Sequence, residues 1–211
     1  MIFSIHLPKC AGTSLQQSIS KQMDPKDVYF DYGDRITDVS KEACVHRARR
    51  VSSLFSRDDF FCKKLVHGHF YAHKYYGYFP ESKYVTVMRN PIKMLPSYYD
   101  YLRRTNQDNT LTRLARSLSC FEEFCEHPWF QNIIHKQIFP LGINDFEVIG
   151  VQENYKLYLD RLSDLIGLDI RERKANTNPK PAYSNEKHVI DKIVINNSID
   201  MELYEQALLQ N

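Results

Sequence analysis

A short turn with several chemically useful residues joins an apolar, strand-like run to a run with helical spacing within residues 2–19. The first N–H groups of a helix lack intrahelical acceptors and carry a partial positive charge, so such a turn can hold an anion. Gly12 lets the backbone approach the anion closely, and Lys9 adds a charge. Thr13 and Ser14 add hydroxyl donors. These residues indicate a cradle for a phosphate-like group, although an ordinary strand-to-helix turn with a capping hydroxyl fits them too.

The same turn departs from the Walker pattern G-x-x-x-x-G-K-[ST] of ATP-binding enzymes. The lysine of that pattern would fall on Thr13, and its first glycine would fall on Leu7. Such enzymes also need a carboxylate near a strand end to hold magnesium, for which Asp31 or Asp34 is a candidate. A nucleotide or small-molecule kinase therefore remains an alternative that the missing lysine weakens.

A second candidate anion site lies around Arg89, which follows a buried strand and precedes Asn90 and Pro91, a typical helix start. An arginine at this position can point into the ligand crevice of a parallel sheet and bind a phosphate with two hydrogen bonds. Ser97 can join it if Pro96 kinks or interrupts the helix. The alternative is a surface arginine with a solvated serine.

Two histidines, His67 and His69, flank Gly68 at the end of another expected strand. Alternation along the strand places both rings on one face, and histidine is the usual group for removing a proton from an attacking hydroxyl. Two other interpretations stay open. The pair can be structural and hydrogen-bonded, or it can form a metal site with His73 as third ligand.

The rest of the chain predicts an α/β fold with a mainly parallel central sheet flanked by helices, in one domain over residues 1–211. Apolar or β-branched runs predict strands within residues 2–6, 27–34, 63–70, 83–90 and 145–154. Helical spacing predicts helices from about residue 12, over 90–104, over 155–166 ended by Gly167, and over 184–196 and 198–210. The remaining segments predict an exposed helix over 40–57, a surface excursion over 105–118 and a short helix within 117–130. Ligands of such sheets bind at the carboxyl ends of the strands, so the loops 7–14, 67–73, 89–97 and 152–155 are expected to carry the site.

Composition limits the classes of function. Of 211 residues, 43% are hydrophobic and 26% are charged, which indicates a packed core, and a net charge of +2 argues against nucleic acid. The basic motif HRARR (46–50) is expected to be a solvated helix face. Five cysteines without a metal or disulfide spacing favour a reduced, cytoplasmic protein. No run of about 18 apolar residues predicts a membrane span, and the chain opens on a core strand, so we expect no leader.

Four segments, in order, resemble a known family: HLPKCAGTSL, VHGHF, VMRNPIKMLPSYYDYLR and VIGVQENYKLYLDRL. They are similar to sulfotransferases that use 3′-phosphoadenosine 5′-phosphosulfate (PAPS), and most to the branch with heparan sulfate 2-O-sulfotransferase and bacterial relatives. The C-terminal IDMELYEQAL is similar to the closing helix of that branch. The resemblance covers nearly the whole chain. It implies a P-loop-like, three-layer fold and transfer of a sulfuryl group to an acceptor hydroxyl or amine.

The resemblance also implies roles for particular residues. The loop for the 5′-phosphosulfate would consist of Lys9, Cys10, Ala11, Gly12, Thr13 and Ser14. Arg89 and Ser97 would hold the 3′-phosphate, and Asn176 and Lys180 lie in a segment that would close over the nucleotide. His69 would be the general base, with His67 as an auxiliary and Lys9 stabilising the leaving group. Because a sulfuryl group carries less charge than a γ-phosphate, no metal is required.

The chain departs from the family pattern at three positions. Met94 stands where a second arginine is usual, Cys10 stands where threonine or serine is usual, and Pro96 directly precedes Ser97. These departures keep a non-catalytic nucleotide-binding relative as an alternative. The short chain favours a small-molecule or carbohydrate acceptor. Aromatic residues after the histidines either line an acceptor pocket or belong to the core: Tyr71, Tyr75, Tyr76, Tyr78 and Phe79.

Overall fold

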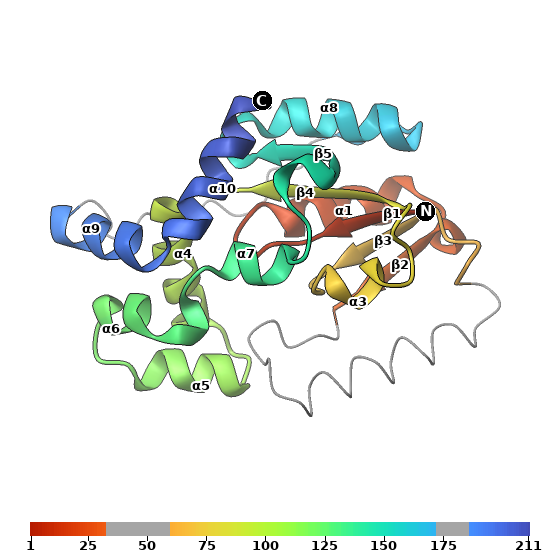
Figure 1. The fold of residues 1–211 in the computed structure, drawn as a ribbon. Helices are drawn as coiled ribbons and strands as arrows, with labels where there is room; N and C mark the ends of the chain where they lie inside the picture. Colours follow the sequence, from red (N-terminus) through yellow and green to blue (C-terminus); the bar gives the residue numbers. More distant parts are fainter. Residues whose placement is uncertain (33–59, 172–185) are drawn as a thin grey trace.

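The computed structural model describes residues 1–32, 60–171 and 186–211. Its centre is a sheet of five parallel strands in the order β2-β3-β1-β4-β5 (Figure 1). The strands are β1 (Ile2–Ile5), β2 (Val28–Asp31), β3 (Leu65–Gly68), β4 (Lys83–Met88) and β5 (Phe146–Val151). Each strand lies within its expected range. The predicted α/β class with a parallel sheet is confirmed.

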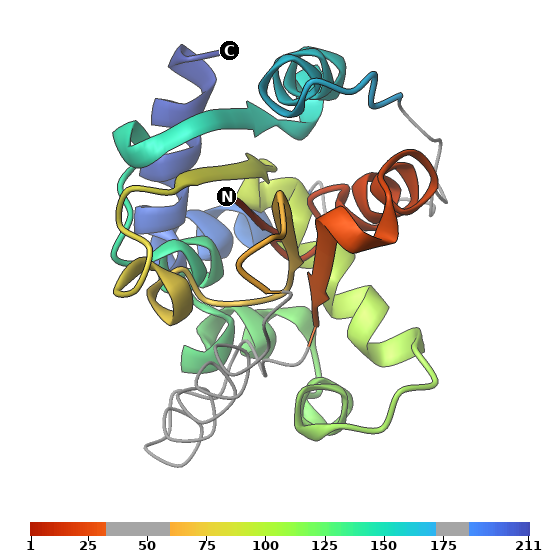
Figure 2. The same ribbon diagram turned by 90° about the vertical axis from the view of Figure 1, so that its right-hand side faces the viewer.

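Helices cover both faces of the sheet, which gives the expected three layers. Helices α1 (Gly12–Gln22) and α8 (Tyr155–Ile166) lie on one face, and α3 (His73–Tyr76), α7 (Ile133–Ile138) and α10 (Ser198–Leu209) lie on the other (Figure 2). Residues of β1 alternate between the two layers. Phe3 stacks on Tyr75 of α3 and on Tyr84 of β4, with ring centroids 4.8 and 5.2 Å apart. Ser4 points to the opposite face, where its hydroxyl meets His67.

The other helices gather beyond the carboxyl ends of the strands (Figure 1). They are α4 (Pro91–Arg104), α5 (Thr110–Ser117), α6 (Phe121–Glu126) and α9 (Lys187–Asn196). Short 3₁₀ turns occur at η1 (Pro25–Asp27), η2 (Pro128–Phe130), η3 (Ile143–Asp145) and η4 (Gln152–Asn154). Helix α4 packs against α5, α6 and α9, so it links the sheet to this outer group.

Helix α4 starts as predicted but does not stop at its internal proline. The side chain of Asn90 accepts a hydrogen bond from the N–H of Ile92 at 2.9 Å, and Pro91 is the first helical residue. Of the two expected effects of Pro96, a kink or an interruption, the interruption does not occur, because the helix continues to Arg104. The proline removes one backbone hydrogen bond, and burial of one whole side of the helix compensates for it. The buried side chains are Pro91, Met94, Leu95, Pro96, Tyr98, Tyr99 and Leu102.

Helices α3, α5 and α7 had no counterpart in the sequence prediction. Helix α5 replaces part of the surface excursion and begins with a capping box, in which the N–H of Thr112 donates to Asn109 and the N–H of Asn109 donates to Thr112. The N-terminus of helix α7 is capped by a residue of another helix. The carboxylate of Asp200 in α10 accepts hydrogen bonds from the N–H groups of Ile134 and His135, at 2.9 and 2.8 Å.

Several predictions fall outside the described residues. They are the helix over 40–57, the HRARR motif, Asp34, Cys44, and the nucleotide-closing residues Asn176 and Lys180. The four cysteines within the described residues, Cys10, Cys62, Cys120 and Cys125, are free thiols. Across the described part of the chain, the helices are too short or too polar for any of them to cross a bilayer.

Candidate active site

The loop after β1 has an unusual backbone. Lys9 and Ala11 both adopt the left-handed region, with φ of 60° and 61°. This conformation costs a non-glycine residue roughly 1–2 kcal/mol, and such strain concentrates at functional sites. The first α-helical hydrogen bond runs from the N–H of Leu15 to the carbonyl of Ala11 at 3.1 Å. The N–H groups of residues 12–14 therefore lie in the first turn of α1, where no intrahelical acceptor is available.

Gly12 meets a packing requirement that the sequence did not indicate. A Cβ atom at this position would lie 1.7 Å from Cδ2 and 1.8 Å from Nε2 of His6. The glycine is therefore needed because the His6 ring packs on the start of α1. The close approach that Gly12 allows is thus made by the His6 ring, and the binding of an anion by the backbone at Gly12 stays a prediction. An anion at the loop would meet the backbone N–H groups, Lys9 and the exposed Thr13 instead.

The two departures from the family pattern in the loop and in α4 contact each other. Cys10 and Met94 are both fully buried, with Sγ of the cysteine 3.9 Å from Sδ of the methionine. The thiol also donates to the carbonyl of Pro8 at 3.3 Å, and the N–H of Cys10 donates to Leu7. Burial raises the pKa of this thiol to about 12. Cys10 therefore fixes the loop to α4 from within, and neither its thiol nor its N–H faces a ligand.

The ammonium of Lys9 lies over the ring of Tyr101 in α4, 4.7 Å from the ring centroid. Burial lowers the pKa of Lys9, and the charges of Arg89 and Arg104 lower it further. Cations are thus brought close together although they repel each other. Such an arrangement favours binding of an anion, which would relieve the repulsion.

Arg89 lies next to the same loop, and its Nη1 donates to the carbonyl of Lys9 at 3.3 Å. Within residues 1–32, 60–171 and 186–211, no carboxylate lies within salt-bridge distance of Lys9 or Arg89. Ser97 is half-buried on α4, four residues before Tyr101 and so on the same side of the helix. The structure therefore places both predicted cations and the predicted serine at one end of the sheet.

The two predicted histidines belong to a group of three. The rings of His67 and His69 are nearly parallel to the ring of His6, with interplanar angles of 12° and 19° and centroids 5.6 and 3.9 Å away. This arrangement agrees with the expectation that both rings share one face of the sheet. His6 directly follows the central strand β1 and lies on the same side, so the rule that selected the other two could also have selected it.

Hydrogen bonding and exposure distinguish His69 from His67. Nδ1 of His69 lies 2.6 Å from the carbonyl oxygen of His6. A carbonyl can only accept, so Nδ1 carries the hydrogen and Nε2 has a free lone pair. His69 is partly exposed, whereas His67 is fully buried with Nδ1 2.9 Å from Oγ of Ser4. Burial lowers the pKa of His69 to about 4 and that of His67 to about 3, so both are neutral at pH 7.

Two groups hold His6 in place and were missed in the sequence. The side-chain nitrogen of the buried Gln137, in α7, donates to the carbonyl of His6 at 3.0 Å and to that of Phe70 at 3.2 Å. The hydroxyl of Tyr32 lies 3.2 Å from Nδ1 of His6. Neither residue carries a local signal, because each is defined by a contact with a distant part of the chain.

The alternative metal sites find little support in the geometry. His73 is exposed at the start of α3, with its ring 5.2 Å from that of Tyr71. In the described ranges, no three or more His, Cys, Asp or Glu side chains are grouped to hold a metal ion. Asp31 pairs with Lys74 at 2.5 Å and accepts from the hydroxyl of Tyr75 at 2.8 Å, on the α3 face of the sheet. Its carboxylate therefore lies on the opposite face from α1.

The aromatic residues after the histidines mostly belong to the core. Tyr71 and Tyr75 are buried, and Phe79 packs on Phe3 with ring centroids 5.4 Å apart. Tyr78 is 57% exposed. Of the two interpretations given above, the structure favours the core for most of this group, so an acceptor pocket must be sought elsewhere.

Comparison with known proteins supports the fold. No family model matches the chain, and no curated protein matches it. A crystal structure of a sulfotransferase from Alicyclobacillus acidocaldarius aligns with a TM-score of 0.55 and 16% identity, over 97% of this chain and 94% of that one. The chain has the fold of that sulfotransferase. Mouse sulfotransferase SULT7A1 complexed with PAP aligns with a TM-score of 0.45 and 14% identity, over 95% of this chain and 64% of that one.

The three neighbouring histidines His6, His67 and His69 predict that acid destabilises the protein. An unfolded histidine titrates near 6.5, whereas burial lowers the pKa of His69 to about 4 and of His67 to about 3, and the pKa of His6 is also lowered. Between about pH 6.5 and 4 the unfolded chain therefore binds protons that the folded chain does not. Stability must fall as the pH falls through this window. Asp200, whose pKa burial raises to about 6, acts in the opposite direction but is a single group.

Urea unfolding at pH 7.5, 6.0 and 5.0 measures this effect. Each neutral buried histidine should contribute up to about 1.4 kcal/mol per pH unit to the slope. His67→Gln should reduce the slope by one such contribution. A free energy of unfolding that stays constant or rises between pH 6.0 and 5.0 would show that the histidines are not buried in neutral form.

Proposed function

We propose that this chain transfers a sulfuryl group from PAPS to an acceptor hydroxyl by in-line displacement. One observation carries the proposal. Lys9 and Arg89 adjoin the first turn of α1, and neither has a carboxylate partner among the described residues. His69 lies at the same end of the sheet with an unprotonated Nε2. Binding two anionic groups and removing one proton is the chemistry that this transfer requires.

The donor would bind through two of its anionic groups. The backbone of residues 11–14 and Lys9 would hold the 5′-phosphosulfate at the start of α1. Arg89, with Ser97, would hold the 3′-phosphate through charge-assisted hydrogen bonds. The prediction that Asn176 and Lys180 close over the nucleotide is part of the proposal.

In the transfer step, Nε2 of His69 takes the proton of the acceptor hydroxyl as its oxygen attacks sulfur. A bond forms between that oxygen and sulfur, and the bond from sulfur to the 5′-phosphate oxygen breaks. The leaving product is 3′-phosphoadenosine 5′-phosphate (PAP), whose terminal oxygen gains negative charge. Lys9 and the loop N–H groups would stabilise that charge, and such preorganised electrostatic stabilisation is usually the largest contribution to the rate.

The low pKa of His69 is compatible with its role as a base. Nε2 is unprotonated at neutral pH because burial lowers the pKa to about 4. A nearby anion favours the protonated form of a histidine, so a bound donor would raise this pKa towards the range of an effective base. His67 is fully buried and would act only by positioning the other two rings.

A transfer screen tests the proposed function. PAPS labelled with sulfur-35 is incubated with the protein and a panel of neutral saccharides, acidic saccharides, phenols and alkyl alcohols, and labelled products are separated from PAPS. We expect label to appear in at least one acceptor class, and the same panel with labelled ATP and magnesium to give none. Transfer of phosphate from ATP, without transfer of sulfate, would favour the kinase. PAPS binding without transfer to any class would favour a non-catalytic relative.

A further inference from the structure

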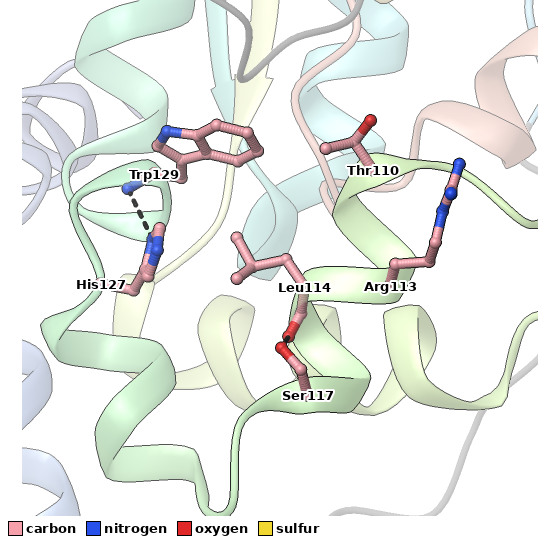
Figure 3. A pocket seen from close by; sticks show the side chains of 6 residues that line it. All are labelled: Thr110, Arg113, Leu114, Ser117, His127 and Trp129. Carbon is pink, nitrogen blue, oxygen red and sulfur yellow. Dashed lines mark hydrogen bonds between the residues drawn. The ribbon is translucent and has the colours of Figure 1, made fainter.

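A groove between α5 and η2 is separate from the residues assigned above. It has a volume of about 590 Å³, within the usual size of small-ligand sites. Its lining residues come from α5 on one side and from η2 and the preceding residue on the other: Thr110, Arg113, Leu114, Ser117, His127 and Trp129. Figure 3 shows Trp129 and His127 on one wall and the residues of α5 on the other, with the side chain of Leu114 extending from α5 toward Trp129 and His127.

The lining of the groove combines an apolar surface with N–H donors. Trp129 and Leu114 supply an apolar surface, Arg113 and His127 supply N–H donors, and none of the lining residues is acidic. The N–H of Trp129 donates to Nδ1 of His127 at 3.2 Å, which leaves Nε2 of the neutral ring as a donor. Arg113 pairs with Asp108 at 3.3 Å, but both side chains are about 70% exposed, and such surface pairs contribute little and are easily exchanged.

Helix α4 connects the groove to the proposed active site. Tyr98 of α4 packs edge-on against Phe130 of η2, with ring centroids 6.4 Å apart, and α5 packs against α4 on the other wall. The same helix carries Tyr101 beneath the ammonium of Lys9. Both walls of the groove therefore pack on the helix that also supports the proposed donor site. Neither Lys9, Arg89 nor His69 lines the groove, so its occupant must extend beyond it to react.

We propose that this groove binds one ring of the acceptor, a saccharide that carries an acidic substituent, while the reacting hydroxyl belongs to a neighbouring ring outside the groove. The inference rests on the proposed function. An apolar indole face suits the C–H face of a sugar ring, and the surrounding hydroxyls and the N–H of His127 suit its hydroxyls. The guanidinium of Arg113 suits a carboxylate or sulfate.

The groove contains its own optical probe, because Trp129 is the single tryptophan of the chain. Its fluorescence, excited at a wavelength that avoids tyrosine, is followed during titration with trigalacturonate, with maltotriose as the uncharged match. We expect a saturable change with trigalacturonate and at least about 10-fold weaker binding of maltotriose. No change with trigalacturonate, or equal affinity for both sugars, would overturn the inference.

Two variants sharpen the test. Arg113→Gln should weaken trigalacturonate at least about 10-fold and leave maltotriose unchanged, whereas Lys83→Gln, at the amino end of β4, removes a charge without effect. An Arg113→Gln protein that binds trigalacturonate as well as the unmodified protein does would overturn the assignment.

The titrations are carried out with and without PAP, whose own binding is measured by calorimetry. Binding of PAP without a fluorescence response rejects only the groove, whereas a response without PAP binding supports the groove and contradicts the proposed donor.

Discussion

Replacing His69 with alanine should lower kcat about 10²- to 10⁴-fold while the affinity for PAP changes little. The Nδ1–H of His69 is held by the carbonyl of His6 at 2.6 Å, which leaves Nε2 as the proton acceptor. Loss of this group raises the barrier to transfer but leaves Lys9 and Arg89 in place to bind the donor. Initial rates at saturating PAPS give kcat, and calorimetric titration with PAP gives the affinity.

The matched variant is His69→Asn. The asparagine amide can still donate to the carbonyl of His6, but it cannot accept a proton from the acceptor. If His69 only holds the loop in shape, His69→Asn should regain most of the activity that alanine loses. If it is the base, both variants should be equally slow. An asparagine variant with normal kcat removes His69 from the reaction.

Replacing Arg89 with alanine should weaken PAP binding about 100-fold or more. Each charge-assisted hydrogen bond to a phosphate contributes about 1.5–3 kcal/mol, and a guanidinium can make two of them. The loss should be larger for PAP than for adenosine 5′-monophosphate, because only PAP carries the 3′-phosphate assigned to Arg89. Calorimetric titration of both nucleotides measures this difference.

Two control variants separate the contribution of bidentate hydrogen bonding to PAP binding from the contribution of positive charge. Arg89→Lys keeps the charge but loses bidentate geometry, so it should recover only part of the affinity. Lys83→Ala removes a positive charge from the opposite end of the same strand, where Lys83 pairs with Glu147 at 2.9 Å, and should bind PAP normally. An Arg89→Ala protein that retains full affinity for PAP would exclude Arg89 from the donor site.

The sheet was predictable because its strands are buried on both faces. Such strands appear in sequence as short apolar runs, as in Tyr84 to Met88, and helices between them require parallel neighbours. Helix ends with local chemistry were also predictable. Asn90 caps α4, and Gly167 ends α8 with a φ of 75°. In these cases, the determinant of the structure lies within a few residues.

Elements stabilised from a distance were not predictable. Helix α7 depends on the carboxylate of Asp200, more than sixty residues later, which accepts from two of its N–H groups. Helix α5 is a different case, because its capping box of Asn109 and Thr112 is a local signal within the sequence. The continuation of α4 through Pro96 depends on burial, which no local rule contains.

The candidate site shows the same division. Ligands bind at the carboxyl ends of parallel strands, and this rule was enough to predict that Lys9, Arg89 and His69 lie at one end of the sheet. The left-handed backbone at Lys9 and Ala11 had no signal, since glycine is the usual residue there. The contact between Cys10 and Met94 joins residues 84 positions apart. Each of these two residues departs from the family pattern in the sequence, but in the structure the two side chains form one buried contact.

Calorimetric titration of the unmodified protein with PAP, adenosine 5′-monophosphate and ATP with magnesium tests the central claim most directly. The claim is that the loop with Lys9 and the guanidinium of Arg89 bind two separate anionic groups of one nucleotide. We predict that PAP binds with one-to-one stoichiometry and at least about 10-fold more tightly than either of the others. Equal affinity for PAP and the monophosphate, or tightest binding of ATP with magnesium, would contradict the account.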